Sequence, residues 1–218
     1  MANLPGRVQP ARPGLQGFDS DTVISLAKAH EFKQAGYEFA IRYLSLGPTQ
    51  APGDLSQGEA MDILRGGLAL MPVQHVLAPG WTPSEALGKT HGANARDNAY
   101  RIGFPARVNI WLDLEGVHKG VYPAAVADYC NAWFAEVAQW GYLPGIYVGA
   151  NTNLTADELY YLLRFSHYWK SASAVPNIPF TGYQLIQYAP FSSELGVSID
   201  RDRTQLDDMG SRVMWLAP

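Results

Sequence analysis

Short apolar runs alternate along the chain with longer helical patterns, which is the order of elements expected in an α/β protein. The candidate strands occupy residues 15–19, 38–44, 68–76, 108–115, 143–149, 167–172, 183–189 and 197–202. Helical patterns follow the first five strands, and several end at a glycine, which tolerates the left-handed conformation that closes a helix. Thr82 with Glu85 and Thr155 with Glu158 have the spacing of a capping box, which marks a helix start.

Strand–helix alternation at this pitch predicts right-handed crossovers, a parallel sheet and, with eight strands, closure into a barrel. The chain has 218 residues, at the small end of the usual size for such a barrel. Residues 173–181 are too few and too rich in proline for a full outer helix, and little chain follows Asp202. We therefore expect an α/β fold, a small TIM-like (β/α)8 barrel that lacks one or more outer helices near its last strands. Residues 1–14 are predicted to be a flexible N-terminal extension, and residues 15–218 to form the barrel domain.

The composition favours a soluble, folded protein that binds no nucleic acid. Apolar residues make up 47% of the chain and charged residues 17%, below the roughly 25% of typical globular domains. The formal net charge is -4, without the basic excess that a binder of phosphate backbones uses. The longest apolar run, at 68–73, is far shorter than the roughly 18 residues of a helix that spans a membrane.

The single Cys130 excludes an intramolecular disulfide and any metal site built from several cysteines. Residues 1–14 contain no apolar segment of the kind found in secretory signals. We therefore expect action in the cytoplasm, export by another route, or loss of a leader. A site of action at a cell wall would require such a route or release by lysis.

Polar residues stand at the ends of several candidate strands, in an otherwise apolar context. They are Asp19, Arg42, Gln74, His75, Asp113, Glu115, Asp200 and Asp202. In a barrel of this kind the carboxyl ends of the strands and the loops after them form the active face. Polar residues there consequently carry more functional weight than polar residues elsewhere.

The fourth candidate strand carries the most informative pair of acids. Strand alternation places Trp111, Asp113 and Glu115 on one face and aliphatic residues on the other. The Cα atoms of the two acids would be about 6.6 Å apart, twice the strand rise, so their charges would raise one pKa. A protonated carboxylic acid beside an ionised one is what a glycosidase needs. The alternative is that both acids form salt bridges to Arg42 or Lys170, or cap neighbouring loops.

The aromatic residues are compatible with a sugar site, because flat rings stack on sugar faces. Those on or just after candidate strands are Tyr43, Trp81, Trp111, Tyr147, Trp169 and Tyr188. Rings of this kind also fill barrel cores. Both interpretations stay open for Tyr147, Trp169 and Tyr188.

Six short motifs add a family resemblance to this interpretation. In chain order they are Gly17-Phe18-Asp19, Ile41-Arg42-Tyr43-Leu44, Leu112-Asp113-Leu114-Glu115, Gly145-Ile146-Tyr147, Gln187-Tyr188 and Ser198-Ile199-Asp200. With these motifs the chain resembles the glycoside-hydrolase-like domain-of-unknown-function family related to family 25 lysozymes, over nearly its whole length. The resemblance implies a glycoside hydrolase with Glu115 as general acid/base and Asp113 as partner carboxylate. It implies Asp19 and Asp200 as further acids of the cleft.

Candidates for substrate binding complete the predicted site. They are Arg42, Gln74, His75, Trp111, Tyr147, Trp169, Gln187 and Tyr188. The expected partner is a β-linked amino-sugar polymer such as the peptidoglycan of a bacterial cell wall, cleaved by a bacterial or phage enzyme. No cofactor and no metal are expected.

Two further interpretations remain open at this point. The barrel could be a carbohydrate-binding or scaffold protein that has lost turnover, or its four acids could be oxygen ligands of a hard divalent cation. The course of hydrolysis is open too. Asp113 could orient a substrate acetamido group or stabilise charge directly, and Asp200 could serve as nucleophile or base. A carboxyl separation of about 5 to 5.5 Å would favour direct retention, and about 6.5 to 9.5 Å inversion.

Overall fold

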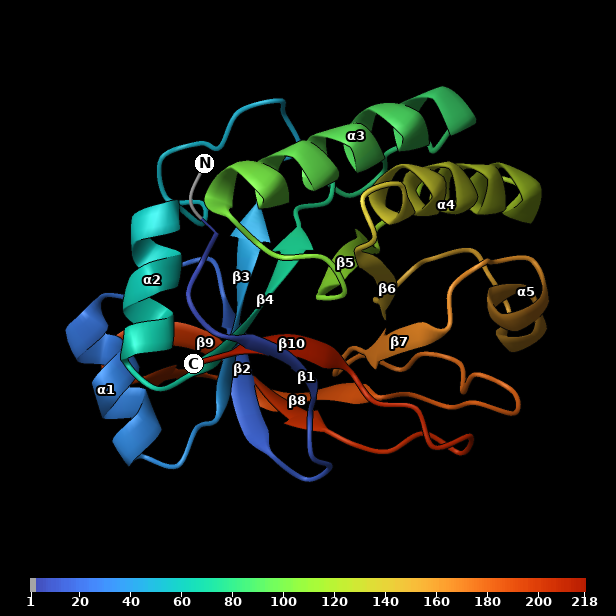
Figure 1. Cartoon of the computed structure of the whole chain (residues 1–218). Helices are drawn as coiled ribbons and strands as arrows, with labels where there is room; N and C mark the ends of the chain where they lie inside the picture. Colours follow the sequence, from blue (N-terminus) through green and yellow to red (C-terminus); the bar gives the residue numbers. More distant parts are fainter. Residues whose placement is uncertain (1–2) are drawn as a thin grey trace.

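The structure, a computed structural model that describes residues 3–218, is built around a closed barrel (Figure 1). Within those residues its eight strands are β2 (Gln16–Ser20), β3 (Phe39–Leu44), β4 (Ala69–Gln74), β5 (Asn109–Leu114), β6 (Leu143–Val148), β7 (His167–Lys170), β8 (Leu185–Glu194) and β9 (Val197–Thr204). Each strand pairs with the next in the chain, and β9 pairs with β2 to close the ring. The predicted strands and the predicted barrel are confirmed.

The last strand of the ring runs against the expected direction. β9 is antiparallel to both β8 and β2, because Leu195 and Gly196 alone connect the paired residues Glu194 and Val197. Both turn residues have positive φ, 52° and 76°, as a two-residue hairpin turn requires. The expectation of a wholly parallel sheet is therefore wrong for β9. No crossover helix was needed, because the chain reverses in place.

Helices cover only part of the barrel wall. Within residues 3–218 they are α1 (Leu26–Gln34), α2 (Gln57–Arg65), α3 (Glu85–Ile102), α4 (Pro123–Ala138) and α5 (Ala156–Tyr161). In the described chain, none lies between β7 and β8 or between β8 and β9. The expected absence of outer helices near the last strands is confirmed. No helix in this part of the chain has the length and apolar character needed to cross a membrane.

One of the two predicted capping boxes is present at a helix start, and the other is not. Thr155 and Glu158 form the predicted capping box at the start of α5. The box predicted at Thr82 is wrong, because α3 begins later. There Ser84 is extended and its hydroxyl accepts from the Leu87 amide. The left-handed Gly103 closes the same helix at its other end, as expected.

Two further strands, outside the ring of eight, lie at the end of the barrel where the parallel strands begin. β1 (Arg7–Pro10) pairs antiparallel with β10 (Met214–Ala217), and Leu216 of β10 pairs with Leu70 near the start of β4. Part of the predicted extension, residues 1–14, thus lies in β1, while residues 1–2 lie outside the described residues. The domain boundary at residue 14 stays a prediction.

Candidate active site

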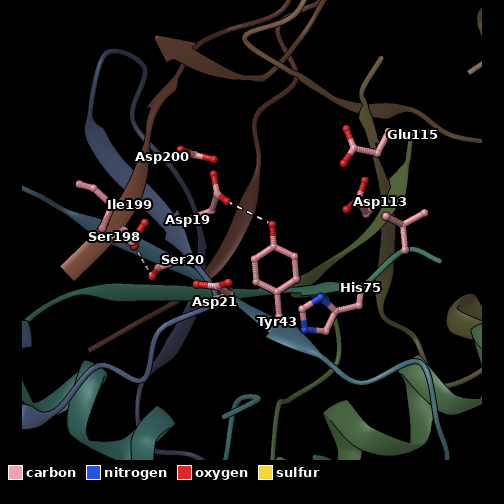
Figure 2. Close-up of a pocket in the computed structure, with 11 residues that line it drawn as sticks. Asp19, Ser20, Asp21, Tyr43, His75, Asp113, Glu115, Ser198, Ile199 and Asp200 are labelled. Atoms are coloured by element: carbon pink, nitrogen blue, oxygen red, sulfur yellow. Dashed lines mark hydrogen bonds between the residues drawn. The ribbon is translucent and has the colours of Figure 1, made fainter. Parts of the chain in front are cut away.

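A cavity of about 310 Å³ opens at the end of the barrel where the parallel strands finish. Its lining residues are Asp19, Ser20, Asp21, Tyr43, His75, Val76, Asp113, Glu115, Ser198, Ile199 and Asp200. Figure 2 shows Asp113 and Glu115 on one side, Asp19 and Asp200 on the other, and Tyr43 between them. Of the five acids predicted from strand ends, Asp19, Asp113, Glu115 and Asp200 therefore meet at one cavity.

Asp113 and Glu115 form the β5 wall of this cavity. Asp113 is only 6% exposed, and its Oδ1 has no hydrogen-bond partner among the described residues. Burial, followed by the charges of Glu115 and Asp19, raises the pKa of Asp113 well above its ordinary value. Glu115 is half-buried, and burial raises its pKa too. Both groups are therefore shifted toward the protonated form.

The β5 wall carries no salt bridge to a described residue. Arg42 instead pairs with Glu59, with Nε 2.6 Å from Oε1, and Lys170 lies 5.8 Å from the centre of the Tyr183 ring. The interpretation of the β5 acids as salt-bridge partners of Arg42 or Lys170 is therefore wrong. Both residues line the cavity instead.

Gly149, just after β6, leaves the space that Glu115 occupies. A Cβ at this position would lie 2.5 Å from Glu115 Cβ and 2.6 Å from its Oε2. Such distances are shorter than any ordinary contact, so a larger residue at 149 would displace the Glu115 carboxyl. Glu115 thus depends on a neighbouring strand for its position as well as on β5.

Asp19 and Asp200 form the opposite wall, where β2 meets the reversed β9. The two residues are direct partners in the β2–β9 register. The Gln187 amide on β8 donates to Asp19 at 2.9 Å and to Asp200 at 3.4 Å, and the Tyr43 hydroxyl donates to Asp19 at 3.3 Å. The antiparallel direction of β9 brings its first half, and with it Asp200, to the cavity.

Burial and hydrogen bonding have opposite effects on the pKa of Asp19. Burial raises the pKa of Asp19 to about 7, the bond from Gln187 opposes this shift, and the charge of Asp200 adds to it. Burial, with the charges of Asp21 and Glu115, raises the pKa of Asp200 to about 6. Both acids consequently change charge near neutral pH.

Gln187 has its orientation fixed by two donors on its other side. Its Oε1 accepts from the Tyr147 hydroxyl at 2.9 Å and from the Ala172 amide at 3.2 Å. An amide oxygen only accepts and an amide nitrogen only donates, so the nitrogen must point at Asp19 and Asp200. Tyr147 and Gln187, both predicted to bind substrate, thus lie beside the acids and position one wall.

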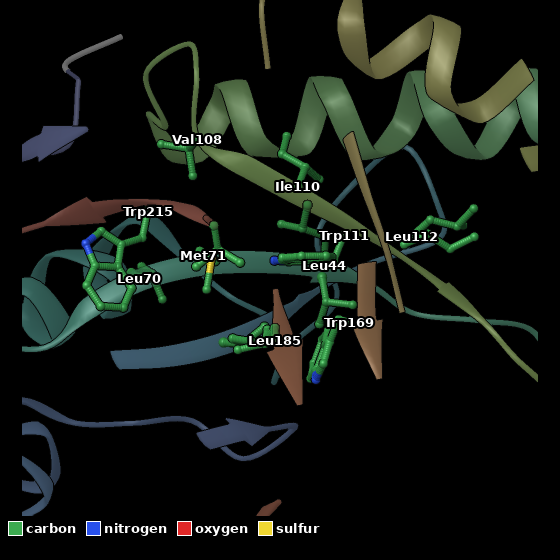
Figure 3. Packing of buried hydrophobic residues seen from close by; sticks show 14 of the residues in the cluster. Leu44, Leu70, Met71, Val108, Ile110, Trp111, Leu112, Trp169, Leu185 and Trp215 are labelled. Carbon is green, nitrogen blue, oxygen red and sulfur yellow. The ribbon is translucent and has the colours of Figure 1, made fainter. Parts of the chain in front are cut away.

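Large buried rings fill the barrel interior below the acids, and Figure 3 shows Trp111 and Trp169 among the buried residues. Trp111 and Trp169 are 0% and 1% exposed and meet edge to face, with ring centres 5.8 Å apart. Gly145 gives Trp111 its space, since a Cβ there would lie 2.4 Å from the ring. Both tryptophans were predicted to bind substrate, but the structure buries them under the cavity.

A fifth acid, Asp202, lies beside these rings. It is fully buried and accepts from Trp169 Nε1 at 2.9 Å, while its Oδ2 has no partner in the described chain. Burial, and then the charge of Asp19, raises its pKa well above the ordinary value. Asp202 therefore favours the neutral form and supports these rings without opening to the cavity.

Three more predicted binding residues lie away from the cavity because of strand alternation. Arg42 is 0% exposed on the outer face of β3, where it also donates to the Gly53 carbonyl at 2.7 Å. Gln74 is 0% exposed and bonded to the His91 carbonyl at 2.9 Å and to Trp133 at 2.7 Å. Tyr188 follows the inward-facing Gln187 and does not line the cavity.

His75 does line the cavity, and so does Tyr43, which the predicted site residues did not include. Its ring stacks on Tyr43 at 4.4 Å, and its Nε2 lies 2.8 Å from Asp54 Oδ1. Tyr43 shares the inward face of β3 with Phe39 and Ile41, so alternation could have identified it. Asp21, just beyond β2, was also missed, because it lies outside any strand pattern.

The interpretation of the acids as ligands of a divalent cation finds no support in the geometry. Over residues 3–218, no group of three or more His, Cys, Asp or Glu side chains is arranged to hold a metal ion. The acids of the cavity stand on separate walls instead of converging on one point.

Comparison with known protein families identifies one match, which covers most of the chain. Residues 30–203 match the family model described as Rv2525c-like, glycoside hydrolase-like domain. The family resemblance carried by the sequence motifs is thereby confirmed. No curated protein gave a significant match.

Solved structures share the fold at low sequence identity. An uncharacterized protein of B. stearothermophilus is 19% identical, with a TM-score of 0.65 over 88% of this chain and 96% of that one. A muramidase from Trichobolus zukalii is 16% identical, with a TM-score of 0.58 over 87% and 93%. A family 25 glycosyl hydrolase from Bacillus anthracis is 11% identical, with a TM-score of 0.55 over 94% of each chain.

Proposed function

We propose, from the premise that this chain belongs to the Rv2525c-like glycoside hydrolase-like family, that it hydrolyses a β-linked amino-sugar polymer such as peptidoglycan. One observation carries the proposal. Asp113 and Glu115 open from one strand end into a cavity whose opposite wall holds two more acids, and no cation pairs with the β5 acids in the described chain. The muramidase and family 25 hydrolase of the same fold agree with this assignment.

Glu115 is the general acid/base of the proposed reaction. It is the more accessible acid of the β5 wall, and burial keeps its pKa above the ordinary value. A carboxylic acid that holds its proton near working pH donates it to the glycosidic oxygen as the bond breaks. The same group then takes a proton from the incoming water.

Asp113 is the partner carboxylate. It lies deeper than Glu115 on the same strand face, and its Oδ1 has no protein partner among the described residues. Positive charge that develops at the anomeric carbon would favour the ionised form of Asp113. The group then stabilises this charge directly or orients an acetamido group of the substrate.

Asp19 and Asp200 hold the far side of the substrate. Gln187 and Tyr43 fix their carboxyl groups, so this wall presents oxygen acceptors in a set geometry. Sugar hydroxyls are donors that such acceptors bind. Asp200, half-buried and less tightly bonded than Asp19, is the base toward water in the alternative, inverting course, in which Glu115 acts as acid only.

The test compares the release of reducing ends from purified peptidoglycan by the wild type, Glu115→Gln and the matched control Glu31→Gln. Glu31 is exposed on α1, and its carboxylate pairs with Lys28 at 2.7 Å. We expect Glu115→Gln to lose about 10²- to 10⁴-fold in rate, with the melting temperature almost unchanged and the control fully active. Mass spectrometry of the new chain ends identifies the bond that is cleaved.

Equal activity of Glu115→Gln and wild type would remove Glu115 from the mechanism. If the wild type releases no products but binds glycan saturably, the barrel is a carbohydrate-binding protein that has lost turnover.

A further inference from the structure

Glu115 stands just beyond the end of its strand. β5 ends at Leu114, and Gly116 turns the chain with a positive φ of 66°. A peptide outside the strand ladder needs other partners for its C=O and its N–H. The position of the Glu115 carboxyl group therefore depends on the partners of the peptide that joins Glu115 to Gly116.

Two loops hold the chain after β5 from opposite sides. On the side of β6, the Gly116 amide donates to the Ala150 carbonyl at 2.8 Å. On the side of β4, the Gly80 amide donates to the Gly116 carbonyl at 2.7 Å, and Trp81 forms a parallel bridge with Val117. These contacts join backbone groups, so they depend little on which side chains the loops carry.

The Glu115 carbonyl differs from these groups, because its partner is a side chain. Trp81 Nε1 donates to it at 2.8 Å. The peptide between Glu115 and Gly116 is thus held at its C=O by Trp81 and at its N–H by Ala150. An indole N–H is a donor, and phenylalanine has no such group. The position of Glu115 therefore depends on the identity of residue 81.

The Trp81 ring is itself fixed by the outer helices. It is 7% exposed and meets the Tyr129 ring of α4 edge to face, with ring centres 4.9 Å apart. The Tyr129 hydroxyl lies 3.0 Å from His91 Nδ1 on α3. Trp81 is not among the residues that line the cavity. It therefore contacts the backbone of Glu115 from outside the site and does not touch a substrate bound there.

We propose that Trp81 is a positioning residue for Glu115, because its indole N–H fixes the peptide that sets where this carboxyl group enters the cavity. The proposal rests on the proposed function, since it assigns Trp81 a part in the same reaction. Without the indole donor, the Glu115 carbonyl loses its partner from the β4 loop, and the peptide can rotate. A rotation moves the carboxyl group relative to the glycosidic oxygen, and small displacements of a reacting group lower the rate. The loss falls on the chemical step and not on the binding of substrate.

The experiment compares Trp81→Phe with the matched control Trp133→Phe in the hydrolysis of peptidoglycan fragments by the full chain. Each variant loses one indole hydrogen bond, of 2.8 Å to the Glu115 carbonyl or of 2.7 Å to Gln74 Oε1. Trp133 is 0% exposed on α4. We expect Trp81→Phe to lower kcat about five- to tenfold with KM almost unchanged. Trp133→Phe should lower the melting temperature at least as much and keep the wild-type kcat.

Two further measurements separate the N–H from folding and from turnover. Benzothienylalanine incorporated at position 81 keeps the shape of the indole without its N–H, so it should reproduce the loss in kcat. NMR titration of isotope-labelled glutamate, with the signal assigned by Glu115→Gln, measures the pKa of Glu115 without turnover. Burial raises this pKa, and a carboxyl group released toward water has a lower one. We therefore expect the pKa to fall in Trp81→Phe and to stay unchanged in Trp133→Phe. The titratable groups that interact with Glu115, the same in both variants, are Asp113, Tyr147 and Asp200.

Wild-type kcat in Trp81→Phe, or an equal loss of kcat in Trp133→Phe, would overturn the role of Trp81 while leaving the proposed function intact. A wild type that releases no products would remove the proposed function, and the NMR titration then decides alone. An unchanged pKa of Glu115 in Trp81→Phe would overturn the hold of Trp81 on this acid, and a lowered pKa would support it.

Discussion

The two walls of the cavity differ in the hydrogen bonds that the protein donates to their acids. On the wall formed by β2 and β9, Asp19 receives donors from Gln187 and Tyr43, and Asp200 shares the first of them. On the β5 wall, Asp113 Oδ1 has no donor from the described chain. The acids of the β2–β9 wall, here the fixed wall, accept hydrogen bonds from the protein, whereas the β5 wall, here the bare wall, contains a buried oxygen without a donor in the described chain. The fixed wall is suited to holding a substrate and the bare wall to reacting with it.

Apart from the replacement of Glu115 itself, the largest expected effect comes from moving the bare wall without changing its chemistry. Gly149→Ala would place a methyl group 2.5 Å from Glu115 Cβ and so displace its carboxyl group. A displacement of about 1 Å is expected to cost about 10²-fold in rate, measured as kcat/KM on cell-wall material. Gly47→Ala, at a position with no atom within 4 Å and no positive φ, is the control. Full activity of the Gly149 variant would show that the position of Glu115 does not matter.

Gln187→Leu should damage the fixed wall by removing its shared donor. At pH 8, where Asp19 with its pKa of about 7 is ionised, we expect a loss of about 2–3 kcal/mol in the free energy of unfolding. At pH 5 the neutral Asp19 needs the donor less, and the loss should shrink. Chemical denaturation at the two pH values measures the difference. An identical loss at both would mean that packing, not charge, is what Gln187 supplies.

Asp113→Asn should have the opposite sign, because the bare wall offers no donor to lose. The folded-state pKa of Asp113 is raised, so the folded protein binds the proton more tightly than the unfolded chain does. Stability from this group is present at acidic pH and is lost as the pH rises through the folded pKa. Asparagine does not titrate, so we expect the variant to be more stable than wild type at pH 8. At pH 4 the two should be equal. A variant that is less stable at pH 8 would contradict the description of this wall as unsolvated.

Tyr43→Phe should have the smallest effect. The bond from its hydroxyl to Asp19 is 3.3 Å long, and Gln187 remains as a donor to the same carboxyl group. We expect a loss of about 0.5–1 kcal/mol at pH 8. The control is Tyr122→Phe, at a residue that is 81% exposed. A loss as large as that of Gln187→Leu would make Tyr43 an equal partner in the fixed wall.

Strand alternation explains which of the predicted site residues reach the cavity. It places Asp113 and Glu115 on one inward face, and the cavity lining agrees. The same rule assigns Arg42 to the outer face beside Ala40 and Leu44, because Phe39, Ile41 and Tyr43 face inward. Polar residues at strand ends, chosen without regard to the face on which they lie, therefore include residues that bond to the outer helices, such as Arg42 and Gln74.

Other features depend on pairing between distant segments. The direction of β9 follows from a two-residue turn at Leu195 and Gly196, which a pattern of apolar positions does not resolve. The depth of Trp111 and Trp169 depends on how far side chains from opposite strands fill the interior. The Gln187 bonds to Asp19 and Asp200 require β2, β8 and β9 to be adjacent. The sequence pattern therefore predicts which residues belong to the site, whereas the contacts between them depend on closure of the barrel.

The pairing of β1 with β10 has a practical consequence. Arg7 lies opposite Ala217, and β10 joins the barrel at Leu70, near the start of β4, whereas His75 just beyond the end of β4 lines the cavity. An affinity tag or a surface linker attached at either end would therefore extend from the base of the barrel. Protein immobilised in this way would present its open mouth to an insoluble substrate such as a cell-wall fragment.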